Sequence, residues 1–139
     1  TSPNFKADEW LFWGTNHYDS SHPAFGLNTE PPEDVRPQFA RVAAIWQAVR
    51  FTYGKPLINL SFYRSPEYNL AIGSRSKNHT LIGAADCQPL DFTGGQVATL
   101  HQTILRLRSA GLFKGGVGVY NWGCHIDIRG SNADWDDRT

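Results

Sequence analysis

Two short segments decide the fold of this chain: Asn78-His79-Thr80-Leu81-Ile82-Gly83-Ala84-Ala85-Asp86 and Cys124-His125-Ile126-Asp127-Ile128. In the second segment, His125 and Asp127 alternate with apolar residues, which predicts a strand with one polar face. Residues 83–88 predict another strand, and the small residues before Asp86 leave room for a metal and a substrate. If the two strands pair, His79, Asp86 and His125 can meet. Two His and one carboxylate with an open fourth position make up a catalytic zinc site.

Helices are predicted on both sides of the first segment. Apolar residues at steps of three and four give one apolar stripe over residues 38–53 and another over residues 95–110. Gly54 and Gly111 follow these stripes and are typical of helix ends. Residues 66–72 are long enough for one further short helix.

The rest of the chain predicts short strands and loops. A strand is expected over residues 57–62, and the segments 115–120 and 124–129 flank a tight turn and predict a β-hairpin. Residues 1–37 are rich in proline and predict an irregular wrap. This order predicts a single α+β domain over residues 1–139, in which two main helices pack on a small, mainly antiparallel sheet.

Composition narrows the class of protein. The chain has 139 residues, of which 40% are hydrophobic and 19% charged, as expected for one globular domain. The formal net charge is zero, which argues against a nucleic-acid partner. The apolar runs are far shorter than a membrane span. We expect a monomer. Because the chain begins Thr-Ser-Pro-Asn, the lack of a signal peptide says little about compartment.

Several blocks, in order, resemble the zinc D-Ala-D-Ala carboxypeptidase family, which shares its fold with the hedgehog signalling domain. Residues 61–69, Ser-Phe-Tyr-Arg-Ser-Pro-Glu-Tyr-Asn, resemble its S-G-Y-R-S-P-x-Y-N motif. Residues 79–86 resemble its S-x-H-x-x-G-x-A-x-D motif, although Lys77 takes the place of the Ser two residues before the His. Residues 116–120, residues 125–130 and Trp135 resemble its C-terminal G-G-V-G-x-Y … H-I-D-x-R-G … W block. Ser2-Pro-Asn-Phe5 with Glu9 is similar to the N-terminus of the family.

The resemblance implies a function and roles for individual residues. His79, Asp86 and His125 would be the ligands of a Zn²⁺ cofactor. Arg64 would be a catalytic residue that holds either the terminal carboxylate or the oxyanion of the substrate, for which a guanidinium fork is suited. The implied activity is that of a D,D-carboxypeptidase or endopeptidase on peptidoglycan stem peptides. The implied location is periplasmic or extracellular, in the cell wall, with a phage origin also open.

The chain departs from the family pattern at the general base. Well-studied members carry Glu, Asp or His three residues before the last ligand, where this chain has Trp122. Asp127 is the nearest substitute, two residues from His125 on the same strand face, and we assign it a catalytic role. Two other roles stay open for Asp127: orienting a ligand, or bracing Arg129. Without a base, the chain could instead be a non-catalytic, zinc-containing module that binds cell-wall peptide.

A second departure lies beside the first ligand. The family has Gly three residues after the His, whereas here Ile82 takes that place and Gly83 follows. The spacing between the two ligands is unchanged. We therefore expect a slightly different path for the loop that joins them.

The two cysteines stand next to predicted ligands. Cys87 follows Asp86, and Cys124 precedes His125. If the ligands face one metal from paired antiparallel strands, the cysteines are cross-strand neighbours on the opposite face. A disulfide and a pair of buried thiols both remain open, and a disulfide would suit an exported protein.

The residue types also allow a different metal chemistry. His125-Ile126-Asp127 is an H-x-D pair, and two His with one carboxylate is also a motif of non-haem iron oxygenases. Those enzymes need a distal His well downstream. Only 14 residues follow His125 and none of them is His, so we set this alternative aside.

Overall fold

The computed structural model describes residues 12–93 and 95–139. The similarity of Ser2–Phe5 and Glu9 to the family's N-terminus lies outside the described residues. The elements are η1 (Thr15–His17), α2 (Arg36–Tyr53), β1 (Leu57–Ser61), α3 (Pro66–Ala71), η2 (Asn78–Ile82), β2 (Ala84–Pro89), α4 (Gln96–Ser109), β3 (Gly116–Val119), β4 (Cys124–Asp127) and β5 (Ala133–Asp136).

The strands form one sheet in the order β1-β2-β4-β3-β5. Neighbouring strands are antiparallel except for β3 and β5, which pair in parallel. The predicted α+β class and mainly antiparallel sheet are therefore confirmed. Strand β5 was not predicted, because Ala133-Asp-Trp-Asp136 has little apolar character and only alternate half-burial.

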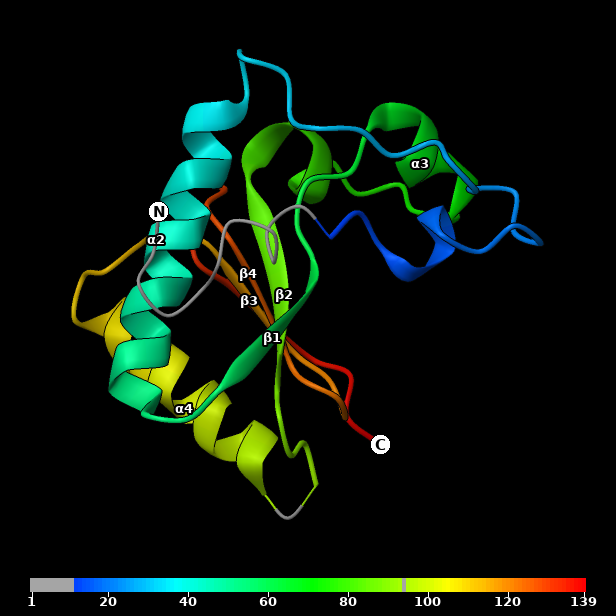
Figure 1. The fold of residues 1–139 in the computed structure, drawn as a ribbon. Coiled ribbons are helices and arrows are strands. Elements are labelled where there is room, and N and C mark those ends of the chain that lie inside the picture. Colours follow the sequence, from blue (N-terminus) through cyan, green and yellow to red (C-terminus); the bar gives the residue numbers. More distant parts are fainter. Residues whose placement is uncertain (1–11, 94) are drawn as a thin grey trace.

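The two long helices cover one side of the sheet (Figure 1). Helix α2 contacts α4 and β2, and α4 also contacts β2, β3 and β4. Helix α2 has a proline in its first turn and ends at Gly54, whose φ of 80° is readily adopted by glycine and whose N–H donates to the carbonyl of Arg50. Both helices agree with the predicted ranges to within two residues, since their apolar stripes are continuous.

Side-chain alternation gives the sheet two different faces. We call core face the one that packs on the helices; its central residues are Ala85, Cys87, Val117, Val119, Cys124 and Ile126. We call metal face the opposite one; its central residues are Asp86, Gly116, Gly118, His125 and Asp127. Because successive side chains of a strand point to opposite sides, the two sets follow from the same register.

The register confirms the predicted pairing of the two deciding segments. Asp86 lies opposite His125, and Cys87 lies opposite Cys124. Gly118 of β3 lies opposite His125 on its other side. The two ligands therefore share the metal face and the two cysteines share the core face.

Residues 12–28, in the described part of the N-terminal wrap, lie on the side of the sheet away from α2 and α4, next to α3 (Figure 1). Buried Asn28 fixes them to the segment after β1. Its side-chain amide donates to the carbonyl oxygens of Trp13 and Tyr63, and its Oδ1 accepts from the backbone N–H of Ser65. These bonds hold the chain immediately around Arg64.

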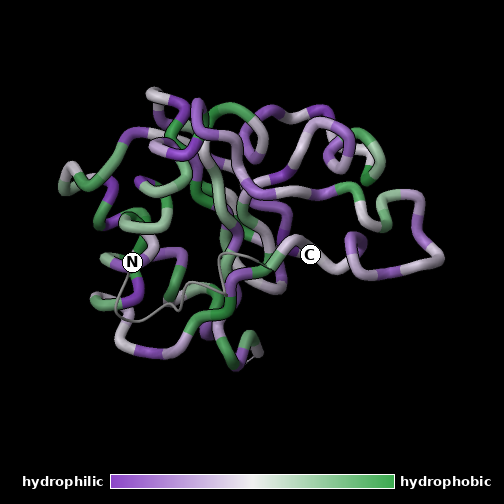
Figure 2. Tube along the Cα trace, turned by 45° about the horizontal axis from the view of Figure 1, so that its top comes forward, coloured by the Kyte–Doolittle hydropathy of each residue, from purple (hydrophilic) through white to green (hydrophobic). Residues whose placement is uncertain are grey.

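Hydrophobic and hydrophilic residues are interspersed along the coloured part of the trace (Figure 2). Among the helices of the described residues, none has the length and apolar content that crossing a membrane requires.

Candidate metal centre

Three buried side chains converge on the metal face. His79, Asp86 and His125 each offer one ligand atom, and these atoms lie within 4.8 Å of one another. Asp86 comes from β2 and His125 from β4, the two central neighbours in the sheet, while His79 comes from the η2 turn that precedes β2. The structure therefore brings together the three residues that the sequence predicts as ligands.

The turn η2 positions His79. It is a single turn of π-helix, closed by a bond of 2.9 Å from the N–H of Gly83 to the carbonyl of Asn78. Gly83 has a φ of 110°, and a Cβ there would press against Gln38 of α2, so this position needs glycine. Gly83, which stands one residue later than the glycine of the family motif, therefore ends a wide turn. This accounts for the different path expected for the loop between His79 and Asp86.

A hydrogen bond selects the nitrogen of His79 that faces the cluster. Nδ1 lies 2.6 Å from the carbonyl oxygen of Phe62. A carbonyl oxygen can only accept, so Nδ1 carries the hydrogen and Nε2 is left with its lone pair. Nε2 lies 3.3 Å from Oδ2 of Asp86. Burial lowers the pKa of His79, which favours the neutral ring that a metal ligand requires.

His125 is held between two carboxylates. Its Nδ1 lies 2.7 Å from Oδ1 of Asp86, and its Nε2 lies 2.8 Å from Oδ2 of Asp127. Burial alone would lower the pKa of His125, but the hydrogen bonds to Asp127 and Asp86 raise it to about 9. With Nε2–H donated to Asp127, Nδ1 is the atom directed at the cluster.

Asp86 is the anionic member of the cluster. Burial opposes its charge, but the charges and hydrogen bonds of His79 and His125 hold its pKa below the ordinary value. The guanidinium of Arg64 adds a further positive charge, 3.7 Å from Oδ2. Asp86 is therefore a carboxylate at neutral pH, as a metal ligand must be.

The donor set fits zinc. A tetrahedral site with bonds of about 2.0–2.1 Å separates neighbouring ligand atoms by about 3.3 Å. His79 and Asp86 meet that separation at 3.3 Å, and the His125 contact at 2.7 Å is shorter, as in a direct hydrogen bond. Two histidine nitrogens, each oriented by a hydrogen bond at the other ring nitrogen, and one carboxylate oxygen could hold one Zn²⁺ and leave a fourth position open.

Asp127 is completely engaged by other groups. Its side chain is 0% exposed, and its two oxygens accept hydrogen bonds of 2.8–3.1 Å from the N–H of Gly116, from Nε2 of His125 and from three N–H groups of Arg129. A carboxylate has about four lone-pair sites. Five donors therefore leave no room for a water molecule. This geometry favours the orienting role, which the sequence left open beside the catalytic one; the catalytic role stays a prediction.

Arg64 lies beside the cluster, where the sequence predicts it. Its Nε donates to the hydroxyl of Ser61 at 3.1 Å. Its backbone N–H donates to the carbonyl of His79 at 2.7 Å, which fixes the segment after β1 to the ligand turn. The guanidinium is mostly buried, with 18% of the side chain exposed. It can reach a substrate bound at the metal with the donors that Asp86 and Ser61 leave free.

Two glycines of β3 shape the metal face. A Cβ at Gly116 would overlap the carboxylate of Asp127, and a Cβ at Gly118 would overlap the indole of Trp135. Trp135 comes from β5 and packs its ring 5.1 Å from that of His125. The glycine-rich strand is visible in the sequence, but Trp135 as the partner of Gly118 is not, because β5 was not predicted.

The core face holds the two cysteines. Cys87 and Cys124 are fully buried, and both carry thiols rather than a disulfide. Burial raises the pKa of Cys124 to about 12. Both side chains lie on the face opposite the candidate ligands. Of the two alternatives left open by the sequence, a disulfide and a pair of buried thiols, the structure shows the thiols.

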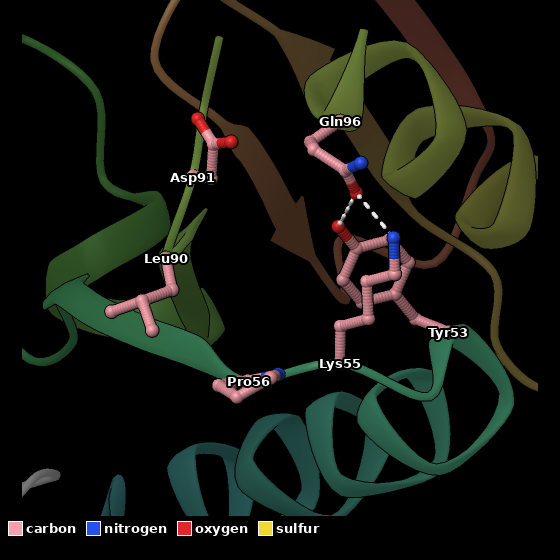
Figure 3. Close-up of a pocket in the computed structure, with 6 residues that line it drawn as sticks. All are labelled: Tyr53, Lys55, Pro56, Leu90, Asp91 and Gln96. Atoms are coloured by element: carbon pink, nitrogen blue, oxygen red, sulfur yellow. Dashed lines mark hydrogen bonds between the residues drawn. The ribbon is translucent and has the colours of Figure 1, made fainter. Parts of the chain in front are cut away.

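A separate cavity of about 250 Å³ lies where α2 ends at Tyr53 and α4 begins at Gln96. Figure 3 shows its lining, in which Gln96 accepts hydrogen bonds from Tyr53 and Lys55 while Leu90 and Asp91 face them across the opening. It contains none of the three candidate ligands.

Comparison with known proteins gave one match. A family model described as Peptidase M15 matches residues 21–127, which include all three candidate ligands. Neither the curated proteins nor the solved structures that were searched contain a significant match to the chain.

Proposed function

The chain belongs to the peptidase M15 family, the zinc D-Ala-D-Ala carboxypeptidase type, and we propose that it hydrolyses peptidoglycan stem peptides as a D,D-carboxypeptidase or an endopeptidase. The observation that carries the proposal is the convergence of three buried, correctly oriented ligand atoms on one face of the sheet. The chemistry that a bound zinc ion supplies in such a site is polarisation of the scissile carbonyl and activation of water.

The chain's own residues would prepare this site before substrate arrives. The carbonyl of Phe62 holds His79 in the required tautomer, and Asp127 does the same for His125. Such partners of metal ligands typically account for about 10–100-fold in metal affinity or activity. We infer that Asp127 serves the reaction mainly by keeping His125 in place.

Arg64 would bind the anionic end or the oxyanion of the peptide. Its contact with Asp86 is long at 3.7 Å, and within the described residues one further bond, from Nε to the hydroxyl of Ser61, engages the guanidinium. An arginine has five N–H donors, so several remain for a carboxylate or a tetrahedral oxygen. A peptidoglycan substrate would place the protein in the periplasm or outside the cell.

One observation favours the second candidate function, a peptide-binding module without turnover. The position of the usual base is Trp122, whose ring stacks on that of Tyr120 at 4.9 Å and cannot accept a proton. Asp127, the nearest other carboxylate on the face, has both oxygens occupied. Tight binding of stem peptide without cleavage would select this function.

The test combines metal content with cleavage of purified muropeptides. Wild type, His125→Ala and Asp127→Asn are compared for bound zinc and for released amino acid or peptide. We expect His125→Ala to lose both. If Asp127 orients His125, Asp127→Asn weakens zinc affinity and lowers turnover together. If Asp127 is the base, zinc affinity stays and only turnover falls. A zinc-loaded wild type that leaves every stem peptide intact and does not bind them contradicts the proposal.

A further inference from the structure

Tyr120 lies at the edge of the candidate centre, on the metal face. It directly follows β3 and stands two residues after Gly118, which pairs with His125. Side chains two apart on an extended strand point to the same side, so Tyr120 shares the face of His125. Its bond to Trp135, which lies against the ring of His125, agrees with this placement.

The cluster lies between Tyr120 and Arg64. In the strand order β1-β2-β4-β3, Arg64 follows β1 and Tyr120 follows β3, while Asp86 and His125 occupy the two strands between them. Tyr120 is close enough to Asp86 and Arg64 to be influenced by their charges. Arg64 and Tyr120 therefore flank the candidate ligands from opposite sides.

One hydrogen bond fixes the direction of the Tyr120 hydroxyl. The indole Nε1–H of Trp135 donates to the phenol oxygen at 2.8 Å. An indole nitrogen can only donate, so the phenol oxygen is the acceptor and its own hydrogen is free for another partner. Within residues 12–93 and 95–139, no acceptor for that hydrogen is seen.

The ring itself is held in place. Tyr120 stacks on Trp122 with ring centroids 4.9 Å apart and planes 5° from parallel. Burial raises the pKa of Tyr120, so the phenol keeps its hydrogen at neutral pH. A fixed, protonated and half-buried hydroxyl beside a metal site is a preorganised hydrogen-bond donor.

We propose that the hydroxyl of Tyr120 donates a hydrogen bond to the scissile carbonyl oxygen of the bound peptide as negative charge develops on it, and that Trp135 positions the hydroxyl for this task. The inference rests on the proposed peptidase function and adds a catalytic residue to it. Tyr120 would supply a neutral donor on the side of the candidate ligands opposite Arg64. Trp122 would hold the ring of Tyr120 in place by stacking on it.

The experiment compares Tyr120→Phe with the matched control Tyr53→Phe. Both variants remove one hydrogen-bonded phenol hydroxyl, but that of Tyr53 is bonded to Gln96 in the cavity of Figure 3. The readouts are bound zinc, thermal unfolding, kcat/KM on a muropeptide, and the Kd of a phosphinate dipeptide whose tetrahedral phosphinyl oxygens mimic the oxyanion. A third variant, Trp135→Phe, removes the indole donor and keeps a smaller aromatic ring, and its bound zinc and thermal unfolding report any loss of packing against His125.

We expect Tyr120→Phe to retain zinc and to bind the phosphinate about 100-fold more weakly, as loss of one oxyanion donor does. Trp135→Phe should fall between it and wild type, and the double variant should be no weaker than Tyr120→Phe alone, because Trp135 acts through the hydroxyl. Tyr53→Phe should match wild type.

Three results overturn the inference while leaving the peptidase function intact: unchanged phosphinate affinity in Tyr120→Phe, an equal loss in Tyr53→Phe, or loss of zinc from Tyr120→Phe. A wild type that binds the phosphinate but cleaves no peptide overturns the hydrolytic function, and the affinity comparison still decides the role of Tyr120. A wild type that does neither overturns both.

Discussion

The core face and the metal face are built from alternate residues of the same strands, yet they are stabilised differently. On β4, Ile126 packs into the apolar core while its neighbours His125 and Asp127 enter a chain of hydrogen bonds. Core-face side chains need only be apolar and of suitable volume. On the metal face the polar side chains are held by specific hydrogen bonds. Glycine occurs at positions 116 and 118, where a Cβ would overlap Asp127 or Trp135.

The difference shows why register matters so much here. A shift by one residue would put Ile126 opposite Asp86 and send His125 into the helices. Because every side chain changes face in such a shift, the apolar residues on the core face protect the geometry of the metal face. Stability and chemistry are thus carried by different residues of the same strands, and substitutions should separate them.

The largest expected effect is on the metal face. His125→Ala removes one ligand and frees Asp127 from its partner, so bound zinc and turnover should both be lost. The loss should exceed the roughly 100-fold typical of an outer-shell partner. Zinc content after dialysis and muropeptide cleavage measure it. The core face is untouched, so circular dichroism should still show a folded protein; an unfolded variant would mean that the metal face is also needed for stability.

The adjacent residue should behave in the opposite way. Ile126→Ala leaves a cavity among Val117, Cys124 and the helices and should lower the free energy of unfolding by about 2–5 kcal/mol. Urea denaturation measures the loss. The folded fraction should still bind one zinc ion, and failure to do so would mean that the two faces are not independent.

A methyl group on β3 should affect both properties moderately. The added Cβ of Gly118→Ala meets the indole of Trp135, so the variant should lose about 1–3 kcal/mol in free energy of unfolding. Denaturation monitored by tryptophan fluorescence checks this. The double variant Gly118→Ala with Trp135→Ala serves as control, because removing the ring removes the overlap; a purely additive loss would contradict the packing argument.

The smallest expected effect concerns the cysteine next to a ligand. Cys124 lies on the core face, so Cys124→Ala should keep full zinc content and lower the free energy of unfolding by about 1 kcal/mol, close to the average for single substitutions. In the native wild type, burial raises the pKa of Cys124 to about 12, so its thiol should resist alkylation at pH 8 and react once the protein is unfolded. Zinc loss in Cys124→Ala would place the thiol on the wrong face.

Local sequence patterns determined much of this protein. The apolar stripes of α2 and α4 and the alternation along β4 mark elements whose side chains face one common core, so the helix ranges and the pairing of β2 with β4 could be predicted. The three candidate ligands were assigned from this pairing together with the resemblance to a known family. The N-terminal wrap and β5 carried little such signal. The wrap depends on the buried side chain of Asn28, and β5 is held by pairing with β3, which no local pattern reveals.

The partner of each polar side chain on the metal face, in contrast, depends on the tertiary structure. The sequence places Asp127 on the strand face of His125, and only the structure shows that five donors occupy its carboxylate, from Gly116, His125 and Arg129. This arrangement favours an orienting role, and the catalytic role stays a prediction. The hydroxyl of Tyr120 is oriented by a hydrogen bond from Trp135, which lies on β5, a strand that was not predicted from the sequence. The physical reason is that periodicity fixes which face a side chain takes, whereas the partner it meets there depends on strands brought together from distant parts of the chain.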